Sequence, residues 1–185
     1  GKPYKEVMIV DGNDMRGIDV GVMTTNDYSV KLMRSHINDL KNNGQPIFSR
    51  DCPEFQIMTP NGDEVWVLPN HFKSKFGGNQ RSSNAKRKLQ ATRTAEIYQR
   101  LISEGKKNVI VLGDLNDTPS SEPIKQILSA GLNLISDSAD YSYVYQGKKQ
   151  LIDHILVSKS LSQNADFGSF DMGPVSDHLG IFAKL

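Results

Sequence analysis

The chain has 185 residues, of which 37% are hydrophobic and 23% charged, and its formal net charge is +1. These values are typical of a globular protein, and we expect residues 1–185 to form one domain. No apolar run approaches the roughly 18 residues of a membrane-spanning helix. Cys52 is the only cysteine, which excludes an intrachain disulfide, and we expect it to be an unreactive loop or core residue.

The first third of the sequence is rich in strand patterns. Lys5–Val10 and Ile18–Thr24 are apolar stretches separated by a turn cluster, which predicts two strands close to a hairpin. Val30–Ile37 fits a strand or a short helix, and the rhythm of its neighbours favours a strand. Phe55–Met58 and Glu64–Leu68 flank an Asn-Gly turn, which is typical of a hairpin.

The middle of the chain predicts a helix that leads into a buried strand. Apolar residues recur at helical spacing from a predicted N-cap at Asn84 to Glu104, and Gly105 follows. The β-branched run at 109–112 then predicts a strand, and a helix followed closely by a strand suggests a crossover packed on a sheet. A second, short helix is expected between Ser121 and Gly131.

The last third of the chain returns to strands. Tyr141–Tyr145 and Leu151–Val157 surround a Gly-Lys-Lys turn and are expected to pair as a hairpin, and Gly180–Leu185 is expected to be the final strand. Many strands with two helices, and no repeat or linker, predict a layered α/β (α+β) fold.

Polar residues that suit phosphoester chemistry lie where apolar strands end or begin. The clusters are His71, Asp114 with Asn116, Asp153 with His154, and Asp177 with His178. A single histidine is more often structural, but recurrence of the same pattern at four strand ends favours a site. Asp114, Asn116 and Asp177 offer hard oxygen ligands for Mg²⁺ or Mn²⁺, with Ca²⁺ as a further option. A histidine held by a carboxylate can take the proton of an attacking water.

The segment from His71 to Lys107 is locally basic. It contains ten Lys or Arg residues against two Glu. The pattern has two interpretations: a solvated helix face with its loop, or an electrostatic surface that attracts phosphates.

Five motifs, in order along the chain, resemble the endonuclease/exonuclease/phosphatase superfamily, most closely its bacterial extracellular nuclease-like branch. They are Asp14–Val20, Asn70–Ser74, Gly113–Asp117, Ile152–Val157 and Ser176–His178. The resemblance implies a four-layer α-β-β-α sandwich of two packed mixed sheets, with the site at one edge of the sheets. It also favours a secreted or periplasmic location, with a cytoplasmic one as the alternative.

The resemblance assigns roles to individual residues. It implies that His178 is the general base, oriented by Asp153, and that Asp177 helps to bind the metal. Asp114 and Asn116 would position the nucleophile and contact the scissile phosphate. The resemblance implies that His71 is a second catalytic or phosphate-contacting residue. Phosphate contacts are also implied for Arg16, Asn70 and His154, although His154 is equally compatible with a structural role.

The sequence departs from the family pattern at its N-terminal side. That pattern begins with a strand ending in Asn and a second element ending in a metal-binding Glu, and neither is present. We therefore expect an N-terminally truncated member that lacks the first strands of the fold. An exposed sheet edge would then favour homodimers, and the missing carboxylate would weaken metal binding.

These observations predict a divalent-metal-dependent phosphodiester hydrolase. We expect a nuclease that cleaves DNA, and RNA as a further substrate, with little sequence preference, by in-line attack of water activated by an Asp-His pair. The first alternative is a phosphomonoesterase or phospholipase-type enzyme acting on a small or lipid phosphate. The second is a catalytically weakened fragment that binds nucleic acid.

Overall fold

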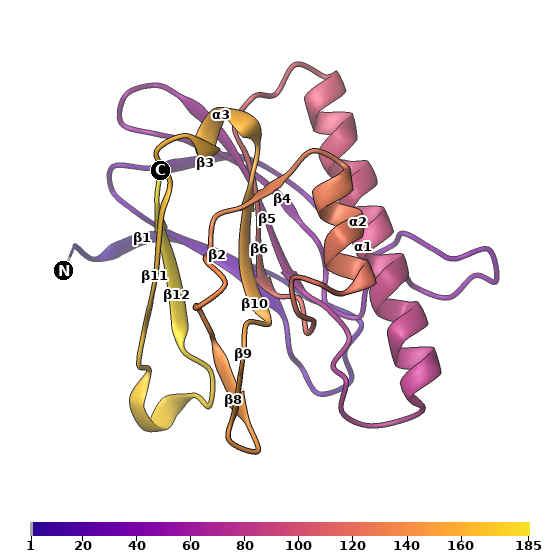
Figure 1. The fold of residues 1–185 in the computed structure, drawn as a ribbon. Coiled ribbons are helices and arrows are strands. Elements are labelled where there is room, and N and C mark those ends of the chain that lie inside the picture. Colours follow the sequence, from indigo (N-terminus) through magenta and orange to yellow (C-terminus); the bar gives the residue numbers. More distant parts are fainter. Residues whose placement is uncertain (1) are drawn as a thin grey trace.

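The centre of the molecule is a six-stranded mixed sheet. The computed structural model describes residues 2–185 (Figure 1). The strand order is β3 (Ser29–Arg34), β4 (Glu54–Met58), β5 (Glu64–His71), β6 (Val109–Asp114), β10 (Asp153–Val157) and β7 (Asn133–Leu134). Only the β5–β6 pair in this sheet is parallel. Parallel neighbours need a crossover, and the helix α1 (Gln80–Ser103) supplies it, as the sequence predicts.

Two helices cover one face of this sheet. α1 packs beside α2 (Glu122–Ser129), and Figure 1 shows both on the same side of the sheet. Their apolar side chains, including Ile97, Leu101 and Ile127, form one buried core with Leu68 and Val111 of the sheet. Burial of this interface is the main stabilising contribution to the fold and fixes the position of β5 and β6.

Two-stranded ribbons lie on the other side of the sheet. They are β1 (Tyr4–Val10) with β2 (Val20–Thr25), and β11 (Asp166–Phe170) with β12 (Gly180–Lys184). β2 contacts β5 and β12 contacts β10, so the ribbons pack on the sheet as a further β layer (Figure 1). The chain thus has the mixed α/β fold expected from its sequence, and within residues 2–185 the helices α1 and α2 cover one face only.

The ribbons leave apolar side chains open to solvent. Tyr4, Val7 and Ile9 of β1 are exposed, and so are Phe170 of β11 and Phe182 of β12. Association of two chains through this region stays a prediction.

Among the helices of the described part of the chain, none has both the length and the hydropathy needed to cross a bilayer.

Most elements agree with the sequence-based predictions, and the ambiguous 30–37 segment forms the strand β3 as far as Arg34. The predicted helix start at Asn84 is wrong, because α1 already begins at Gln80. The side chain of Asn79 accepts the backbone N–H groups of Arg81 and Ser82, at 2.8 and 3.3 Å, and is therefore the N-cap. Asn84 lies inside the helix and accepts a hydrogen bond from Arg87 instead.

The predicted pairing in the last third of the chain is wrong. β8 (Tyr143–Tyr145) pairs with β9 (Lys148–Gln150), and not with the 151–157 segment. Gln146 and Gly147 both have positive φ, at 48° and 76°, which makes the tight two-residue turn that this register requires. The 151–157 segment is thereby free to enter the central sheet as β10. The strand β11 was not predicted, because its sequence, Asp-Phe-Gly-Ser-Phe, is short and contains glycine.

A buried ion cluster joins β3 and β4 to α1. The carboxylate of Glu54 is fully buried and binds His36, Arg34 and Arg100, while Asp39 binds the other nitrogen of His36 at 2.9 Å. Burial raises the pKa of Glu54, but the hydrogen bonds from His36 and Arg100 outweigh it, so that its pKa lies below the ordinary value. The ionised carboxylate therefore stabilises the folded state.

Replacing Glu54 with Gln should cost about 2–3 kcal/mol at pH 7, because cationic partners are left uncompensated although Arg34 is partly screened by solvent. The pKa of Glu54 is lower in the folded state than in the unfolded state. Its contribution to stability is therefore complete at a pH above the unfolded-state pKa and is lost as the pH falls through the folded-state pKa. The difference between wild type and Glu54→Gln in urea unfolding should therefore shrink below about pH 4.5. Glu96→Gln, at an exposed pair with Arg93, is the control and should change stability by about 0.5 kcal/mol or less. Equal effects of the two substitutions would contradict the assignment.

Candidate active site

Three neighbouring strands place His71, Asp114 and Asp153 in one row. His71 is opposite Asp114 in the parallel β5–β6 pair, and Asp153 is opposite Asp114 in the antiparallel β10–β6 pair. Residues directly opposite each other on neighbouring strands project from the same face of a sheet. Nε2 of His71 lies 3.5 Å from Oδ2 of Asp114. The sheet register thus brings together residues that are far apart in the sequence.

The backbone around Asp114 has a conformation that depends on glycine. Gly113 has a φ of 126°, and a Cβ atom there would lie 2.0 Å from the carbonyl oxygen of Asn70. Only glycine permits this approach of β5 and β6. Asn116 then turns back with a φ of 53°, and its backbone N–H donates to Oδ1 of Asp114 at 2.9 Å. Its side-chain amide donates to Oδ2 of Asp114 and to the carbonyl of Phe72, so the Asn116 side-chain oxygen is the atom left for a ligand.

His178 and Asp153 form a hydrogen-bonded pair. Nδ1 of His178 lies 2.7 Å from Oδ2 of Asp153, and this bond is the main cause of a pKa above the ordinary histidine value. In the neutral ring Nδ1 is therefore the donor, and Nε2 carries the lone pair. The arrangement is that of a general base whose tautomer is fixed by a carboxylate.

A second histidine is held neutral by an arginine. Nη2 of Arg50 lies 3.1 Å from Nε2 of His71, and since a guanidinium only donates, Nε2 must be the acceptor. Burial, followed by the positive charge of Arg50, lowers the pKa of His71 to about 4. His71 can accordingly donate a hydrogen bond through Nδ1 but does not carry charge near neutral pH.

Arg50 and Arg16 share one carboxylate. Nε of Arg50 lies 3.1 Å from Oδ2 of Asp14, and Arg16 contacts both oxygens of Asp14, at 3.0 and 3.1 Å. The hydrogen bond from Arg16 holds the pKa of Asp14 well below its usual range. Arg50 and Asp14 were not predicted as site residues. Asp14 is part of a motif that was recognised, whereas Arg50 lies in a segment with no strand or helix periodicity that could have pointed to it.

A pocket of about 560 Å³ collects most of the predicted residues. It is lined by Arg16, His71, Asp114, Asn116, Asp177 and His178, with Arg50 beside them. Asp153 does not line the pocket itself but accepts a hydrogen bond from His178, which does. Asn70 and His154 do not line the pocket. Asn70 is buried and bonds to the Leu68 carbonyl and the Thr94 hydroxyl, and His154 is fully buried with Nε2 2.7 Å from the carbonyl of Asp117.

The donor set can hold a divalent cation. Asp114, Asp153 and His178 each offer a ligand atom, and these atoms lie within 4.8 Å of one another. Burial and the nearby charge of Asp153 raise the pKa of Asp114 to about 6, and a cation would relieve this crowding of negative charge. Carboxylate oxygens with room for water suit Mg²⁺ or Mn²⁺. Asp177 lies in the same pocket but outside this group, and no glutamate among residues 2–185 lines the pocket.

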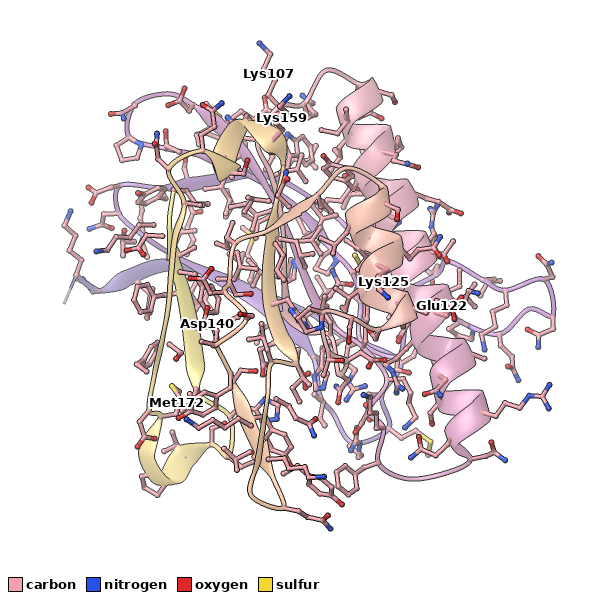
Figure 2. All side chains as sticks on the ribbon, in the orientation of Figure 1. Lys107, Glu122, Lys125, Asp140, Lys159 and Met172 are labelled. Carbon is pink, nitrogen blue, oxygen red and sulfur yellow. The ribbon has the colours of Figure 1, made fainter. Side chains whose placement is uncertain are left out.

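The basic segment is mostly neutralised within the protein. Six of its ten cations form ion pairs with carboxylates: Lys75, Arg87, Lys88, Arg93, Arg100 and Lys106. Lys107 precedes β6, whereas the site follows its end, and Figure 2 shows Lys107 at the end of the molecule away from the β8–β9 hairpin. Of the ten, only Lys75 lines the pocket. The segment is therefore closer to a solvated, paired helix face than to a phosphate-binding surface.

The arrangement of strands and helices is shared with solved structures. The catalytic domain of human Nocturnin with bound sulfate is 18% identical with a TM-score of 0.64, and the match covers 86% of this chain and 60% of that one. A truncated TDP2 from Caenorhabditis elegans is 17% identical with a TM-score of 0.69, over 97% of this chain and 74% of that one. The mannosyl-6-phosphatase Bt3783 of Bacteroides thetaiotaomicron is 17% identical with a TM-score of 0.67, over 98% and 76%.

At these identities the similarity shows a common fold. A search of curated protein sequences finds no significant match. The sequence model of the Endonuclease/Exonuclease/phosphatase family, however, matches residues 2–183, and the chain belongs to this family. The family consists of hydrolases that act on phosphate esters. The chain spans 60% of the Nocturnin domain to which it is similar.

Gly113→Ala tests the close approach of β5 and β6. We expect a loss of about 3 kcal/mol or more in chemical denaturation, because the new methyl group would overlap the Asn70 carbonyl at a positive φ. Gly44→Ala is the control, since Gly44 also has a positive φ, of 78°, but nothing within 4 Å of an added Cβ, and it should cost about 1–2 kcal/mol. If the two variants lost equal stability, strand contact at Gly113 would not be the constraint.

Proposed function

We propose that the chain hydrolyses phosphodiesters of nucleic acid with the help of a divalent cation. The observation that carries the proposal is the His178–Asp153 pair beside Asp114, in one pocket with Arg16 and Arg50. A proton acceptor, a carboxylate cluster and two guanidinium groups are the components that attack on a phosphate ester requires.

The residues divide the work as follows. Arg50 and Arg16 bind non-bridging phosphate oxygens, and His71 adds a neutral N–H donor. Nε2 of His178 accepts the proton of the attacking water, and Asp153 stabilises the imidazolium that forms while it keeps the ring in place. Asn116 holds Asp114 in position through its backbone and side-chain N–H groups. A bound Mg²⁺, Mn²⁺ or Ca²⁺, held by Asp114 and Asp153 of the carboxylate cluster with the side-chain oxygen of Asn116, would supply positive charge to the phosphate, and Asp177, in the same pocket, would be a further ligand.

A phosphomonoesterase acting on a small phosphate is the second candidate. It is favoured by the pairing of the basic segment, because a long polyanion gains little from cations that already bind carboxylates. The fold similarity to a mannosyl-6-phosphatase is compatible with it. A weakened, binding-only role is the third, and the lack of a glutamate in the described pocket supports it.

A substrate panel with and without chelator separates these candidates. Plasmid DNA, RNA, a nitrophenyl phosphodiester and a nitrophenyl phosphomonoester are incubated with the protein in Mg²⁺ or Mn²⁺. We expect nicking of the plasmid that EDTA abolishes and added Mg²⁺ or Mn²⁺ restores. Turnover undiminished by EDTA would remove the cation from the proposal, and cleavage of the monoester with intact plasmid would make the phosphomonoesterase the better assignment.

His178→Ala tests the general base. We expect kcat to fall about 10²- to 10⁴-fold, while binding of a DNA oligonucleotide, followed by fluorescence anisotropy, changes only a few-fold. Tyr28→Ala is the control, because Tyr28 is exposed and lies outside the pocket, and it should keep the wild-type rate. An unchanged rate in His178→Ala would mean that another group, or another protein in the preparation, is responsible.

A further inference from the structure

One part of the pocket wall is aromatic and takes no part in the acid–base chemistry described above. It consists of Phe76, from the loop after β5, and Tyr143 and Tyr145, from β8. The ring of Tyr143 lies 4.7 Å from the imidazole of His178. The row therefore begins at the proposed general base and runs along the β8–β9 hairpin, which projects beyond the end of β10 (Figure 1).

The ring of Tyr145 is paired with each of the other two rings. Tyr145 stacks on Tyr143 with ring centres 6.5 Å apart and planes 15° apart. Phe76 meets Tyr145 edge-on, with ring centres 5.4 Å apart and planes 79° apart. Both geometries are favourable for aromatic pairs. We call this set of Phe76, Tyr143 and Tyr145 the aromatic row.

The outer members of the row remain open to solvent. Phe76 is 61% exposed and Tyr145 is 37% exposed. Neither side chain belongs to the hydrophobic core, so packing of the core does not explain why an aromatic residue stands at these positions. Apolar surface that lines a pocket and is not covered by the protein itself is typical of a binding site.

The backbone that carries Phe76 is held by side chains. Nζ of Lys73 donates to the carbonyls of Ser74 and Phe76, at 3.0 and 3.1 Å, and Ser74 Oγ accepts the N–H of Phe76 at 3.0 Å. Gln80 adds a hydrogen bond to the Lys75 carbonyl. Tyr143 and Tyr145 are fixed by the tight β8–β9 turn. An exposed ring on a fixed backbone loses little entropy when a ligand binds.

The ligand that fits has an anionic group next to a flat ring. The arginines and the His178–Asp153 pair define where a phosphate ester reacts, and the row offers ring faces and edges directly beside that point. Gln150, in the same pocket, carries an amide that can both donate and accept. A nucleobase attached to the scissile phosphate meets these conditions, because every base has a π-face and polar edges.

We infer that the aromatic row is a stacking platform for the nucleobase beside the scissile phosphate, which makes unpaired, unstacked strands the preferred substrates. The inference rests on the proposed nuclease function and deepens it. In an intact duplex both faces of each base are covered by its neighbours, so a base must leave the stack before it can reach the row. Duplex DNA is accordingly cleaved more slowly than a single strand of the same sequence.

Two single-stranded oligonucleotides that differ only beside one phosphodiester test the platform. In the first both flanking residues carry bases, and in the second both are abasic tetrahydrofuran residues. Stacking of one base on an aromatic side chain contributes about 5- to 150-fold to binding. We expect kcat/KM at that bond to favour the base-bearing strand by a factor in this range, and a duplex of the first strand to be cut more slowly.

Variants identify the row as the cause of the preference. In the double variant Phe76→Ala/Tyr145→Ala the ratio of the two kcat/KM values should fall toward one, mainly through slower cleavage of the base-bearing strand. Tyr145→Phe should keep the ratio, because stacking requires the ring and not the hydroxyl group. Tyr28→Ala is the matched control, since Tyr28 is 42% exposed and lies outside the pocket. Far-UV circular dichroism and thermal melting verify that each variant is folded.

The outcomes separate the platform from the proposed function. Equal cleavage of both oligonucleotides by the wild type would overturn the inference of a stacking platform but would agree with the proposed nuclease function. A preference that survives in Phe76→Ala/Tyr145→Ala would also overturn it. Failure of folded wild-type protein to cleave either strand in Mg²⁺ or Mn²⁺ would overturn the nuclease function and the platform with it.

Discussion

The register of β5, β6 and β10 is the constraint on which the site depends. It sets His71, Asp114 and Asp153 side by side, and a shift of one residue in either pairing would turn one of these side chains to the opposite face. The register is in turn held by the apolar contacts of α1 and α2 with the sheet, because these require the alternate residues of β6 to face the helices. The hydrophobic core therefore determines the geometry of the polar site.

The loops beyond these strands are joined by a second, buried network. Asp117, after β6, binds Nε of Arg87 at 3.0 Å and Nζ of Lys75 at 2.7 Å, and its carbonyl accepts from His154 of β10. Arg87 also donates to the carbonyl of Lys73. A buried guanidinium with several partners is costly to separate from them, so this network holds the loop after β5 and the loop after β6 against α1 and β10. His154 supports the site in this way without facing it.

The sequence was sufficient for the features that are local or periodic. Apolar runs with polar residues at their ends predicted the strands β6 and β10 and the positions of Asp114 and His178 at strand ends. Such features depend on only a few neighbouring residues. It was not sufficient for Arg50, whose role depends on contacts with Asp14 and His71 that lie 36 and 21 positions away. It also could not place Asn70, because the direction of a side chain at a strand end depends on which neighbour, here Thr94 of α1, offers a partner.

Under the proposed function, the charges of the site would couple the binding of a phosphate to that of a cation. Asp14 already neutralises part of the charge of Arg16 and Arg50, so the arginines would position a bound phosphate more than they would attract it. Asp114 and Asp153 face the same region, and burial, followed by the negative charge of Asp153, raises the pKa of Asp114. A phosphate placed beside them adds further negative charge in a partly buried site, where screening is weak. A divalent cation removes that repulsion, so each of the two ligands should bind more tightly in the presence of the other.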